Sequence, residues 1–417
     1  MNILVVGGGG REHAICLALK ASPRVTRIYC APGNGGISQL AECLPIMATD
    51  VEGVTRFALD NAIDYVVVAS DDPLALGMVD VLEDAGIRAF GPHQNAAELE
   101  SSKVFAKRLM KKYNIPTARF ESFAIMADAL RYIEEQGAPI VIKTDGLALG
   151  KGAIVAETIE EARAAVLSMM EDMKFGDSGA RVVIEEYMHG REVTVLAFTD
   201  GEALIPMLSS HDHKRALDGD RGLNTGGMGA VCPSPRYTPE LEKICMETIF
   251  RPTIEAMKAE GRPFRGVIYF ELMLTDTGPR VIEYNARFGD PEAQAVLPML
   301  ETDLLDIMEA VTDSRLRELD IRWRSGAACC VVMASGGYPG DYERGKKITG
   351  LDSVPKDIIV YHAGTKLKDG ELLTNGGRVL GVTATADTLE TAIDKAYAAV
   401  SKIAWDGVHY RTDIGRI

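Results

Sequence analysis

The stretch VIYFELMLTDTGPRVIEYNARFGDPEAQ, residues 267–294, places two acids inside apolar runs. YFELML and RVIEYN are typical of strands, and the Asp-Thr-Gly-Pro sequence at 276–279 is typical of a turn. Glu271 and Glu283 each lie within one of these runs. Because a buried carboxylate is costly unless a cation compensates it, the segment predicts a hairpin that holds two acids side by side over a cation site.

Two polar residues that follow extend this site. Asn285 adds a third oxygen ligand, and such a set suits Mg²⁺ (or Mn²⁺) bound together with phosphates. Arg287 offers a planar fork that suits phosphate or carboxylate. The alternative is that both glutamates lie at strand edges in ordinary salt bridges.

A glycine- and lysine-rich stretch, IVIKTDGLALGKGAIVAE at 140–157, lies upstream. Its glycine spacing is too short for a Walker A loop, and a glycine stands where that loop needs Ser or Thr. The stretch instead predicts two strands joined by a flexible lid whose lysines reach one polyphosphate. The alternative is a plain mobile hairpin with solvated lysines. The candidate nucleotide-binding residues here are Lys143, Gly150, Lys151 and Gly152.

The next candidate segment is RVVIEEYMHGREVTV at 181–195, two strands around a short polar break. We expect the break, beside Glu185, Glu186 and Tyr187, to hydrogen-bond an adenine. Glu192 is placed to reach a ribose hydroxyl.

The N-terminal 92 residues alternate strand and helix patterns, which predicts βαβ units and a parallel sheet with a ligand at the carboxyl ends of its strands. The expected strands are 2–7, 27–34, 63–70 and 87–92, and the expected helices are 11–22 and 51–62. A connecting helix is predicted over 94–114.

Glycines follow the first strand in VVGGGGREH. A dinucleotide fingerprint would need a small residue at Glu12 and an acid ending the second strand, so a nicotinamide site is disfavoured. A glycine turn that opens a helix still makes an anion site, and we expect Gly9, Gly10 and Arg11 to bind one phosphate. The alternative is that these glycines only allow close packing of strand and helix.

The remaining chain has mixed patterns. Residues 115–187 predict strand, helix, hairpin, helix and strand, and 211–230 form a long glycine-rich segment that we expect to be a functional loop. From about residue 325 the pattern is β-rich, with a helix at 388–402. The expected domains are 1–102, 103–324 (with a lid subdomain at about 118–190) and 325–417.

Composition excludes some classes of protein. The formal net charge is −15, which argues against nucleic acid as a partner. The sequence shows no signal-peptide pattern and no apolar run long enough to span a membrane. Seven cysteines without a C-x-x-C pair fit free thiols in a reducing cytoplasm.

Together these residues resemble the ATP-grasp superfamily, and within it the glycinamide ribonucleotide synthetase family. The step from Glu271 to Glu283, followed by Asn285 and Arg287, is similar to the magnesium cage of that superfamily. The motifs that carry the closer resemblance run in order along the chain: GGREH (9–13), APGN (31–34), FGP (90–92), KTDGLALGKG (143–152), DHKR (212–215), NTGGMGA (224–230), RFGDPE (287–292), GGYPGDY (336–342), HAGT (362–365) and TNGGRVL (374–380).

The resemblance implies an α/β and α+β multidomain fold: an N-terminal parallel-sheet domain that binds phosphoribosylamine, a central ATP-grasp domain with a glycine-rich lid, and a small β-rich C-terminal domain. It implies a cytoplasmic ligase, a monomer or weak dimer, that joins glycine to 5-phosphoribosylamine through glycyl phosphate, with ATP as co-substrate. Another ATP-grasp carboxylate–amine ligase and a nucleotide sensor without turnover remain alternatives. Gly8, Asp72 and His211 depart from the family pattern, the first two on the phosphoribosylamine side.

The site residues that follow from the resemblance fall into four groups. Arg287, Lys143 and Lys151 are catalytic candidates, and Lys103 joins the nucleotide-binding residues given above. The candidate metal ligands are Glu271, Glu283 and Asn285. The candidate substrate-binding residues are Gly9, Gly10, Arg11, Asp212, His213, Lys214, Asn224, Thr225, Gly226, Gly227, Met228, Gly229, Asp290, Pro291 and Glu292.

Overall fold

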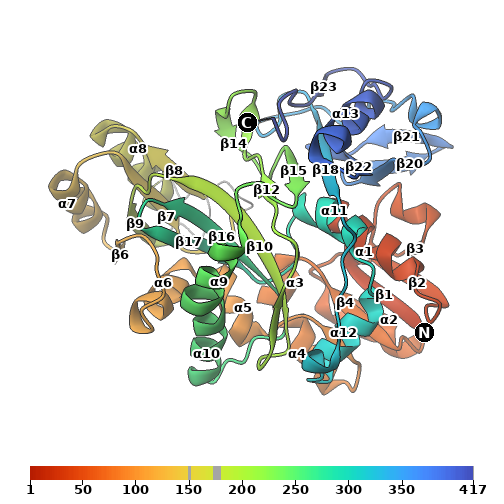
Figure 1. Cartoon of the computed structure of the whole chain (residues 1–417), viewed down its shortest axis with the longest axis horizontal. Coiled ribbons are helices and arrows are strands. Elements are labelled where there is room, and N and C mark those ends of the chain that lie inside the picture. The colour runs from red at the N-terminus through yellow and green to blue at the C-terminus, as the bar shows by residue number, and fades with distance from the viewer. Residues whose placement is uncertain (149–151, 172–179, 417) are drawn as a thin grey trace.

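The structure is a computed structural model that describes residues 1–148, 152–171 and 180–416. Figure 1 shows the N-terminal sheet and the C-terminal part side by side, with the helices α7 (Met126–Gln136) and α8 (Ile159–Met170) at the far end of the molecule. The central strands lie between these two ends, so residues from all three regions can converge on them.

The N-terminal sheet is parallel, as predicted, because strands alternate with crossover helices. Its order is β3-β2-β1-β4-β5, and β3 was not predicted. The strands are β1 (Asn2–Gly7), β2 (Arg27–Pro32), β3 (Glu42–Cys43), β4 (Tyr65–Val68) and β5 (Ala89–Phe90), and the helices are α1 (Gly10–Lys20), α2 (Val51–Asp60), α3 (Asp71–Ala75) and α4 (Met78–Asp84). The apolar runs of β1 and β4 are buried on both faces, as expected in a sheet covered by helices.

The predicted connecting helix over 94–114 is wrong, because the structure has two helices there. α5 (Gln94–Ser101) and α6 (Lys103–Lys112) meet at Ser102, which has extended backbone angles. The Ser102 hydroxyl accepts a hydrogen bond from the Phe105 amide, 3.1 Å away, and donates to the Asp145 carboxylate. Ser102 is therefore an N-cap that starts a new helix, and its tie to Asp145 turns α6 toward the lid.

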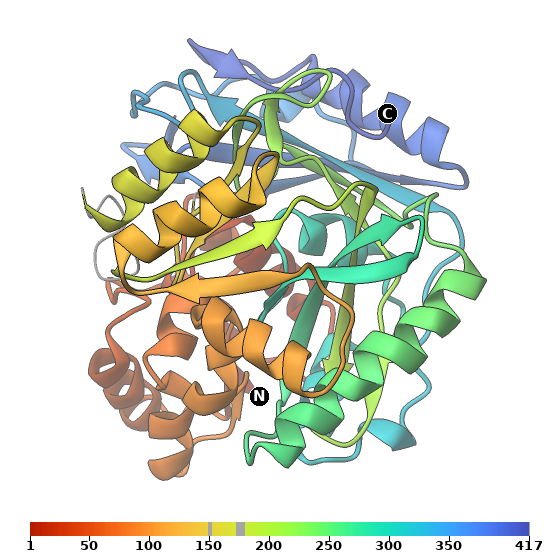
Figure 2. The ribbon, with the colours of Figure 1, turned by 90° about the vertical axis from the view of Figure 1, so that its left-hand side faces the viewer.

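The lid subdomain follows the predicted order of strand, helix, hairpin, helix and strand. Its antiparallel sheet has the order β6-β9-β7-β8, formed by β6 (Phe120–Phe123), β7 (Ile140–Thr144), β8 (Ala153–Ala156) and β9 (Val182–Glu186). Helices α7 and α8 lie side by side against this sheet, and Ile133, Val166 and Ile184 belong to its own small core (Figure 2).

The central sheet has the order β11-β10-β16-β17 and contains the predicted acid hairpin. Its strands are β10 (Arg191–Thr199), β11 (Leu204–Pro206), β16 (Gly266–Thr275) and β17 (Gly278–Asn285), and the chain between β11 and β16 includes α9 (Pro239–Cys245), the π-helical turn Met246–Phe250 and α10 (Arg251–Ala259). Glu271 is paired with Glu283, whereas Leu272 is paired with Val281. Ile282 is thus an extra residue, a β-bulge between the acids and the turn.

The glycine-rich segment 211–230 is not simply a loop, so that prediction is corrected. It contains β12 (His211–Asp212), a hairpin of β13 (Arg215–Leu217) and β14 (Arg221–Asn224), and the start of β15 (Gly229–Cys232). β12 and β15 join β18 (Ala327–Ser335), β22 (Arg378–Ala386) and β19 (Ile359–His362) in one sheet, with β23 (Val408–His409) beside β18. The backbone of β12 and β15 forms its hydrogen bonds in the C-terminal sheet, whereas β13 and β14 pair with each other.

The rest of the C-terminal part matches its predicted pattern. The helix expected at 388–402 is α13 (Leu389–Val400), which packs on β18 and β22 around buried Val331, Ile393 and Val382. A separate hairpin consists of β20 (Thr365–Lys368) and β21 (Glu371–Thr374).

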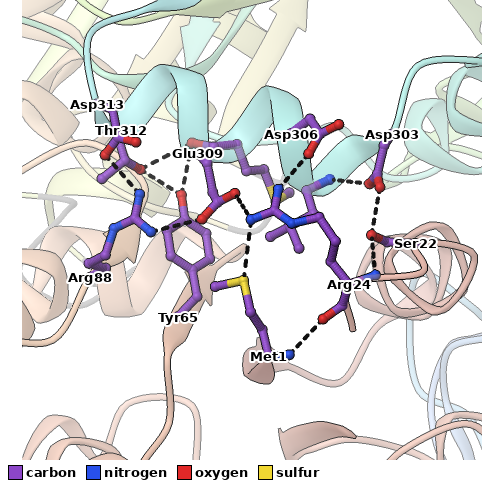
Figure 3. Close-up of polar contacts among 12 residues, drawn as sticks. Met1, Ser22, Arg24, Tyr65, Arg88, Asp303, Asp306, Glu309, Thr312 and Asp313 are labelled. Carbon is purple, nitrogen blue, oxygen red and sulfur yellow. Dashed lines mark hydrogen bonds and ion pairs between the residues drawn. The ribbon is translucent and has the colours of Figure 1, made fainter. Parts of the chain in front are cut away.

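Helix α12 (Leu304–Thr312) returns the chain to the N-terminal sheet, after the short α11 (Glu292–Val296). The buried Glu309 carboxylate pairs with both Arg24 and Arg88, and the Tyr65 hydroxyl donates to the Met308 carbonyl at 2.8 Å (Figure 3). These contacts anchor α12 beneath the sheet. At the carboxyl end of the sheet a different contact, from Arg11 Nη1 to the Phe288 carbonyl at 3.0 Å, holds the motif at 287–292 beside the start of α1.

Candidate functional site

The two acids of the hairpin face one another across β16 and β17. Glu271 is 3% exposed and forms an ion pair with Lys214. Burial raises the pKa of Glu271 to about 8; Lys214 opposes this, and Glu283 adds to it. The arrangement is an acid pair in which only one member can ionise easily without further positive charge.

Glu283 lies among cations from four separate segments. Burial alone would raise its pKa, but the charges of Lys103, Lys143, Lys214 and Arg287 lower the pKa to about 2. These cations come from the start of α6, the end of β7, the segment before β13 and the segment after β17. Three of these cations also pair with other acids, and their convergence on one point is suited to a polyanion.

Lys143 is held in place by a buried network that the sequence did not predict. Its Nζ lies 3.2 Å from Glu185 Oε1 and donates to the carbonyl of the bulged Ile282 at 3.2 Å. Glu185 Oε2 lies 2.9 Å from Nζ of Lys107, which donates to Thr117 at 2.8 Å. Despite burial, the two lysines hold the pKa of Glu185 below its ordinary value. Glu185 therefore positions a lysine, and its carboxylate is not directed at solvent.

In the segment predicted to bind adenine, a second acid, Glu186, is already engaged in ion pairs. Glu186 pairs with Arg119 and Arg280, with Oε2 of Glu186 2.6 Å from Nε of Arg119. The Glu186 side chain thus points toward surface arginines, which leaves the backbone of 186–188 as the candidate adenine contact. Burial raises the pKa of the partly buried Glu192 while Lys214 opposes it, so Glu192 shares the environment of the acid pair.

Arg287 is oriented by groups from three elements. Its Nη2 lies 2.9 Å from Glu100 Oε1 and donates to Asn285 Oδ1 at 3.1 Å. The other Glu100 oxygen accepts the Ala286 amide at 2.7 Å. Burial favours the neutral form of Asp71, but Arg287 and Arg11 lower its pKa below the ordinary value. Glu100 and Asp71 are therefore supporting residues that sequence reasoning missed, since nothing in their local pattern marks them.

Three of the motifs meet beside Arg287. The Arg378 Nη1 donates to the carbonyls of Gly226 and Asp290, the latter at 2.6 Å. Gly227 has a φ of 113°, and a Cβ there would lie 2.5 Å from the Pro291 ring. Only glycine fits at this crossing, so the loop 224–229 is held against the 287–292 motif by close backbone approach.

The loop also has an inward-facing part. Thr225 is buried, and its hydroxyl donates to the Lys214 carbonyl at 2.8 Å. The Met228 side chain is fully buried in the C-terminal core, so only its backbone is available to a ligand. Glu292, also buried, accepts from the Tyr269 hydroxyl at 2.8 Å. Burial and the Asp212 charge raise the pKa of Glu292 to about 7.

At the start of α1, the donors of Gly9 and Arg11 have hydrogen-bond partners within the protein. Glu12 Oε2 accepts the Gly9 amide and Glu12 Oε1 accepts Arg11 Nε, each at 2.6 Å. The Arg11 amide donates to Asp290 Oδ2 at 3.1 Å, and its Nη1 donates to the Phe288 carbonyl. Arg11 is buried with internal partners, which supplies a structural reason for a cation in this first turn. Phosphate binding at Gly9, Gly10 and Arg11 therefore stays a prediction.

Two glycine loops and the C-terminal domain also meet near α1. Asn34 Nδ2 donates to the carbonyls of Gly8 and His362, at 2.9 and 2.8 Å. The His362 amide donates to His13 Nδ1 at 2.8 Å. GGREH, APGN and HAGT thus form one interface.

Gly150 and Lys151 lie outside the described residues, while Gly152 is buried at the base of the lid.

The acid pair and Asn285 fit a hard divalent cation, because all their donors are oxygens and two carry charge. Within the described residues, groups of three or more His, Cys, Asp or Glu arranged for a metal are absent. The candidate cage has two acids and an amide. Glu271 is paired with Lys214, and Asn285 with Arg287.

This fold and site define an ATP-grasp protein: a lid sheet and an acid-bearing sheet face each other across converging lysines. Three family models match the chain, described as the N domain (residues 1–100), the ATP-grasp (A) domain (101–293) and the C domain (328–417) of phosphoribosylglycinamide synthetase. The chain belongs to the phosphoribosylglycinamide synthetase family. Membership of an ATP-grasp ligase family brings ATP use and a general dependence on divalent metal.

Individual relatives agree with this assignment. The chain is 47% identical over 99% of both chains to phosphoribosylamine–glycine ligase of Caldanaerobacter subterraneus. It is 49% identical to that of Halalkalibacterium halodurans, over 100% of this chain and 96% of the relative. The crystal structure of the Thermotoga maritima ligase superposes with a TM-score of 0.88 at 33% identity, covering 99% of this chain and all of that one. Biotin carboxylase of Campylobacter jejuni, at 16% identity and a TM-score of 0.75 over 98% of this chain and 92% of that chain, shares the fold.

Within the described residues, no helix is long and apolar enough to cross a lipid bilayer.

Proposed function

We propose that the chain joins glycine to 5-phosphoribosylamine at the expense of ATP, giving glycinamide ribonucleotide, ADP and phosphate. A glycine carboxylate oxygen attacks the γ-phosphorus, and ADP leaves. The amine nitrogen of phosphoribosylamine then attacks the carbonyl carbon of glycyl phosphate, phosphate leaves, and the nitrogen loses a proton.

The observation that carries this proposal is the set of four cations around Glu283. A carboxylate approaching a triphosphate meets charge repulsion, and preorganised cations offset it with little reorganisation at the moment of reaction. Lys103, Lys143 and Arg287 approach this acid from α6, β7 and the segment after β17. Lys151 would add a further charge from the lid.

Each proposed role follows from position. Lys143, fixed by Glu185 and Ile282, holds the phosphates, and Lys103 supports them from α6. Arg287, fixed by Glu100, orients the glycine carboxylate. Glu192 meets the ribose, while the backbone beside Glu186 and Tyr187 meets the adenine. Glu271, Glu283 and Asn285 would hold Mg²⁺ or Mn²⁺, which supplies charge neutralisation on the phosphates when bound.

The glycine end of the site is proposed at the meeting of two motifs. Asp212, Lys214 and the 224–229 loop face the 290–292 segment, and Arg378 joins the two. The loop has few bulky side chains, which suits a substrate as small as glycine. The phosphate of phosphoribosylamine is proposed near Gly9, Gly10 and Arg11, where a ligand would compete with Glu12 and Asp290 for the same donors.

The test is ADP release with ATP, glycine and freshly made phosphoribosylamine, each omitted in turn, and with alanine in place of glycine. We expect ADP release to need glycine and to fall sharply with alanine. Glycine labelled with ¹⁸O in its carboxylate should transfer one ¹⁸O to the released phosphate. ADP release that is independent of glycine would contradict the proposal and favour another ATP-grasp carboxylate–amine ligase.

Three further proposals accompany the reaction. We place it in the cytoplasm, because all seven cysteines are free and most are buried. We propose a monomer or weak dimer, which sedimentation at two protein concentrations would test. The working division of the chain is 1–102, 103–324 with a lid at about 118–190, and 325–417, although β15 and β18 pair across the second border.

A further inference from the structure

The C-terminal tail, residues 408–416, lies against the hairpin formed by β13 and β14 (Figure 1, where the chain end lies beside β14). This hairpin is continuous at its base with the two proposed glycine-site elements, Lys214 on one side and the loop from Asn224 on the other. Its outer part is open to solvent, with Leu223 66% exposed.

Arg411 is the centre of the contact. It is fully buried, unusual for an arginine, and its donors have partners on both the tail and the hairpin. Its Nη1 donates to the Arg215 carbonyl at 3.1 Å and to Asp220 Oδ1 at 2.8 Å. Its Nε and Nη2 form a fork with the two oxygens of Asp413, at 2.7 and 2.9 Å.

Further bonds run along the same face. Asp413 Oδ2 accepts the Gly219 amide at 2.7 Å, and Asp218 accepts both the amide and the hydroxyl of Thr412. His409 Nε2 lies 2.8 Å from the Ala216 carbonyl. The hairpin therefore receives side-chain or backbone bonds from the tail at almost every residue of its turn.

The tail also reaches the base of the hairpin. The Gly415 amide donates to His213 Nε2 at 3.1 Å, and the His213 backbone is bonded to Gly229 and Met228. The tail itself is fixed to α13, because the Tyr397 hydroxyl donates to the Arg411 carbonyl and accepts the Ile414 amide. Lys214 is thus connected to helix α13 through its neighbours His213 and Arg215, because both bond to the tail.

We propose that the tail, with Arg411 and Asp413 at its centre, is a positioning element that sets the place of Lys214 and the 224–229 loop and so determines the affinity for glycine. The inference rests on the proposed function. Arg411 itself acts through the hairpin and touches no reacting atom. A misplacement of about 1 Å in a substrate-positioning group can cost on the order of 100-fold in rate.

The test compares three variants of the full chain in the glycine-dependent assay. Arg411→Ala removes the centre of the contact. The double variant Asp218→Ala with Asp220→Ala removes the side chains of the hairpin that bond to the tail; both positions lie on the solvent-facing side of the contact, so this variant is the less disruptive to folding. Arg416→Ala is the matched control, since Arg416 belongs to the same tail but pairs with Asp394 of α13 at 2.9 Å. Trypsin cleavage after the exposed Arg221, followed by mass spectrometry, measures loosening of the hairpin.

For the first two variants we expect the KM for glycine to rise about 10- to 100-fold, with the KM for ATP nearly unchanged and faster cleavage after Arg221. Arg416→Ala should match the wild type in both measurements. The inference is overturned if a loosened hairpin leaves the glycine KM unchanged, if neither variant loosens it, or if Arg416→Ala has the same effect. Glycine-independent ADP release by the wild type would instead contradict the proposed function.

Discussion

Glu271 and Glu283 are direct partners on two antiparallel strands, yet the pKa of one is raised to about 8 and that of the other is lowered to about 2. Burial acts on both carboxyls. The difference comes from their neighbours, because Glu283 faces four cations whereas Glu271 lies near Lys214 and a group of acids that includes Glu192. The pair is therefore prepared to accept one more positive charge on the Glu271 side.

The first prediction concerns this pair. Glu283→Gln keeps the shape of the side chain and removes the negative charge around which the cations gather. We expect kcat to fall by about 100-fold or more, as for loss of a preorganised electrostatic group. The far-ultraviolet circular dichroism should stay close to that of the wild type, although the melting temperature falls because the buried cations lose a carboxylate partner. Asp276→Asn in the exposed turn of the same hairpin is the control, and near-normal turnover of Glu283→Gln would mean the cage is misassigned.

The second prediction concerns Lys107, which shares Glu185 with Lys143. Burial lowers the pKa of Lys107 to about 8, although Glu185 opposes the shift. Lys107→Met leaves a buried carboxylate with one partner, which typically costs about 3–5 kcal/mol in the free energy of unfolding. Glu185 then has Lys143 as its one remaining lysine partner and holds it more tightly. We therefore also expect the KM for ATP to rise about 10-fold.

Urea unfolding and initial rates measure these two effects. Lys111→Met on the same helix is the control, since Lys111 is exposed and lies 3.9 Å from its partner Glu121. If Lys107→Met were as stable as Lys111→Met, the buried network would not stabilise the fold. An unchanged ATP KM would remove Lys107 as a positioning residue.

The third prediction is a pH dependence of stability at the interface between the N-terminal and C-terminal parts. Burial lowers the pKa of His13 to about 3 and that of His362 to about 4, from an ordinary value of 6.5. Below pH 6.5 the unfolded chain therefore binds more protons than the folded one. The contribution to stability is fully present above pH 6.5 and is lost as pH falls toward about 4.

Urea midpoints between pH 7.5 and 4 would measure this loss, at up to about 1.4 kcal/mol per pH unit for each histidine. The variant His13→Gln with His362→Asn should show a flatter pH profile, even if it is less stable at pH 7. His189→Asn, at an exposed position, should keep the wild-type slope. Parallel profiles for the double variant and the wild type would refute the assignment.

The fourth prediction concerns Glu309, whose carboxylate pairs with Arg24 and Arg88 under the N-terminal sheet (Figure 3). Glu309→Ala leaves both arginines without this partner and loosens α12. Since the arginines are partly exposed, we expect a loss of about 1–3 kcal/mol in unfolding free energy. Asp320→Ala, in an exposed pair with Arg322, should cost much less. Equal losses in the two variants would show that α12 is held by apolar packing instead.

Much of this fold follows from local pattern. The apolar runs of β1, β4 and β18 are long enough and apolar enough to be buried strands, and a turn joins β16 to β17 as predicted. This turn is shorter than expected, because Gly278 and Pro279 already belong to β17. Ser102 was misread because the helical pattern continues on both sides of it. The small strands within 211–230 were missed because glycines carry no side-chain periodicity, and because β15 pairs with β18, which lies far along the chain. The other three strands pair locally, β12 with β15 and β13 with β14.

The candidate site shows the same division. The sequence by itself determined which residue types exist to bind a nucleotide: two acids in one hairpin, a lysine at the end of a lid strand, and an arginine just after the hairpin. The sequence also predicted that Glu271 and Glu283 lie side by side, but only the tertiary structure decided how, because the bulge at Ile282 shifts the register by one residue and strand side chains alternate between faces. The tertiary structure also decided the partners Lys107, Glu100 and Arg411, since long-range contacts depend on packing between distant segments and leave no local periodicity.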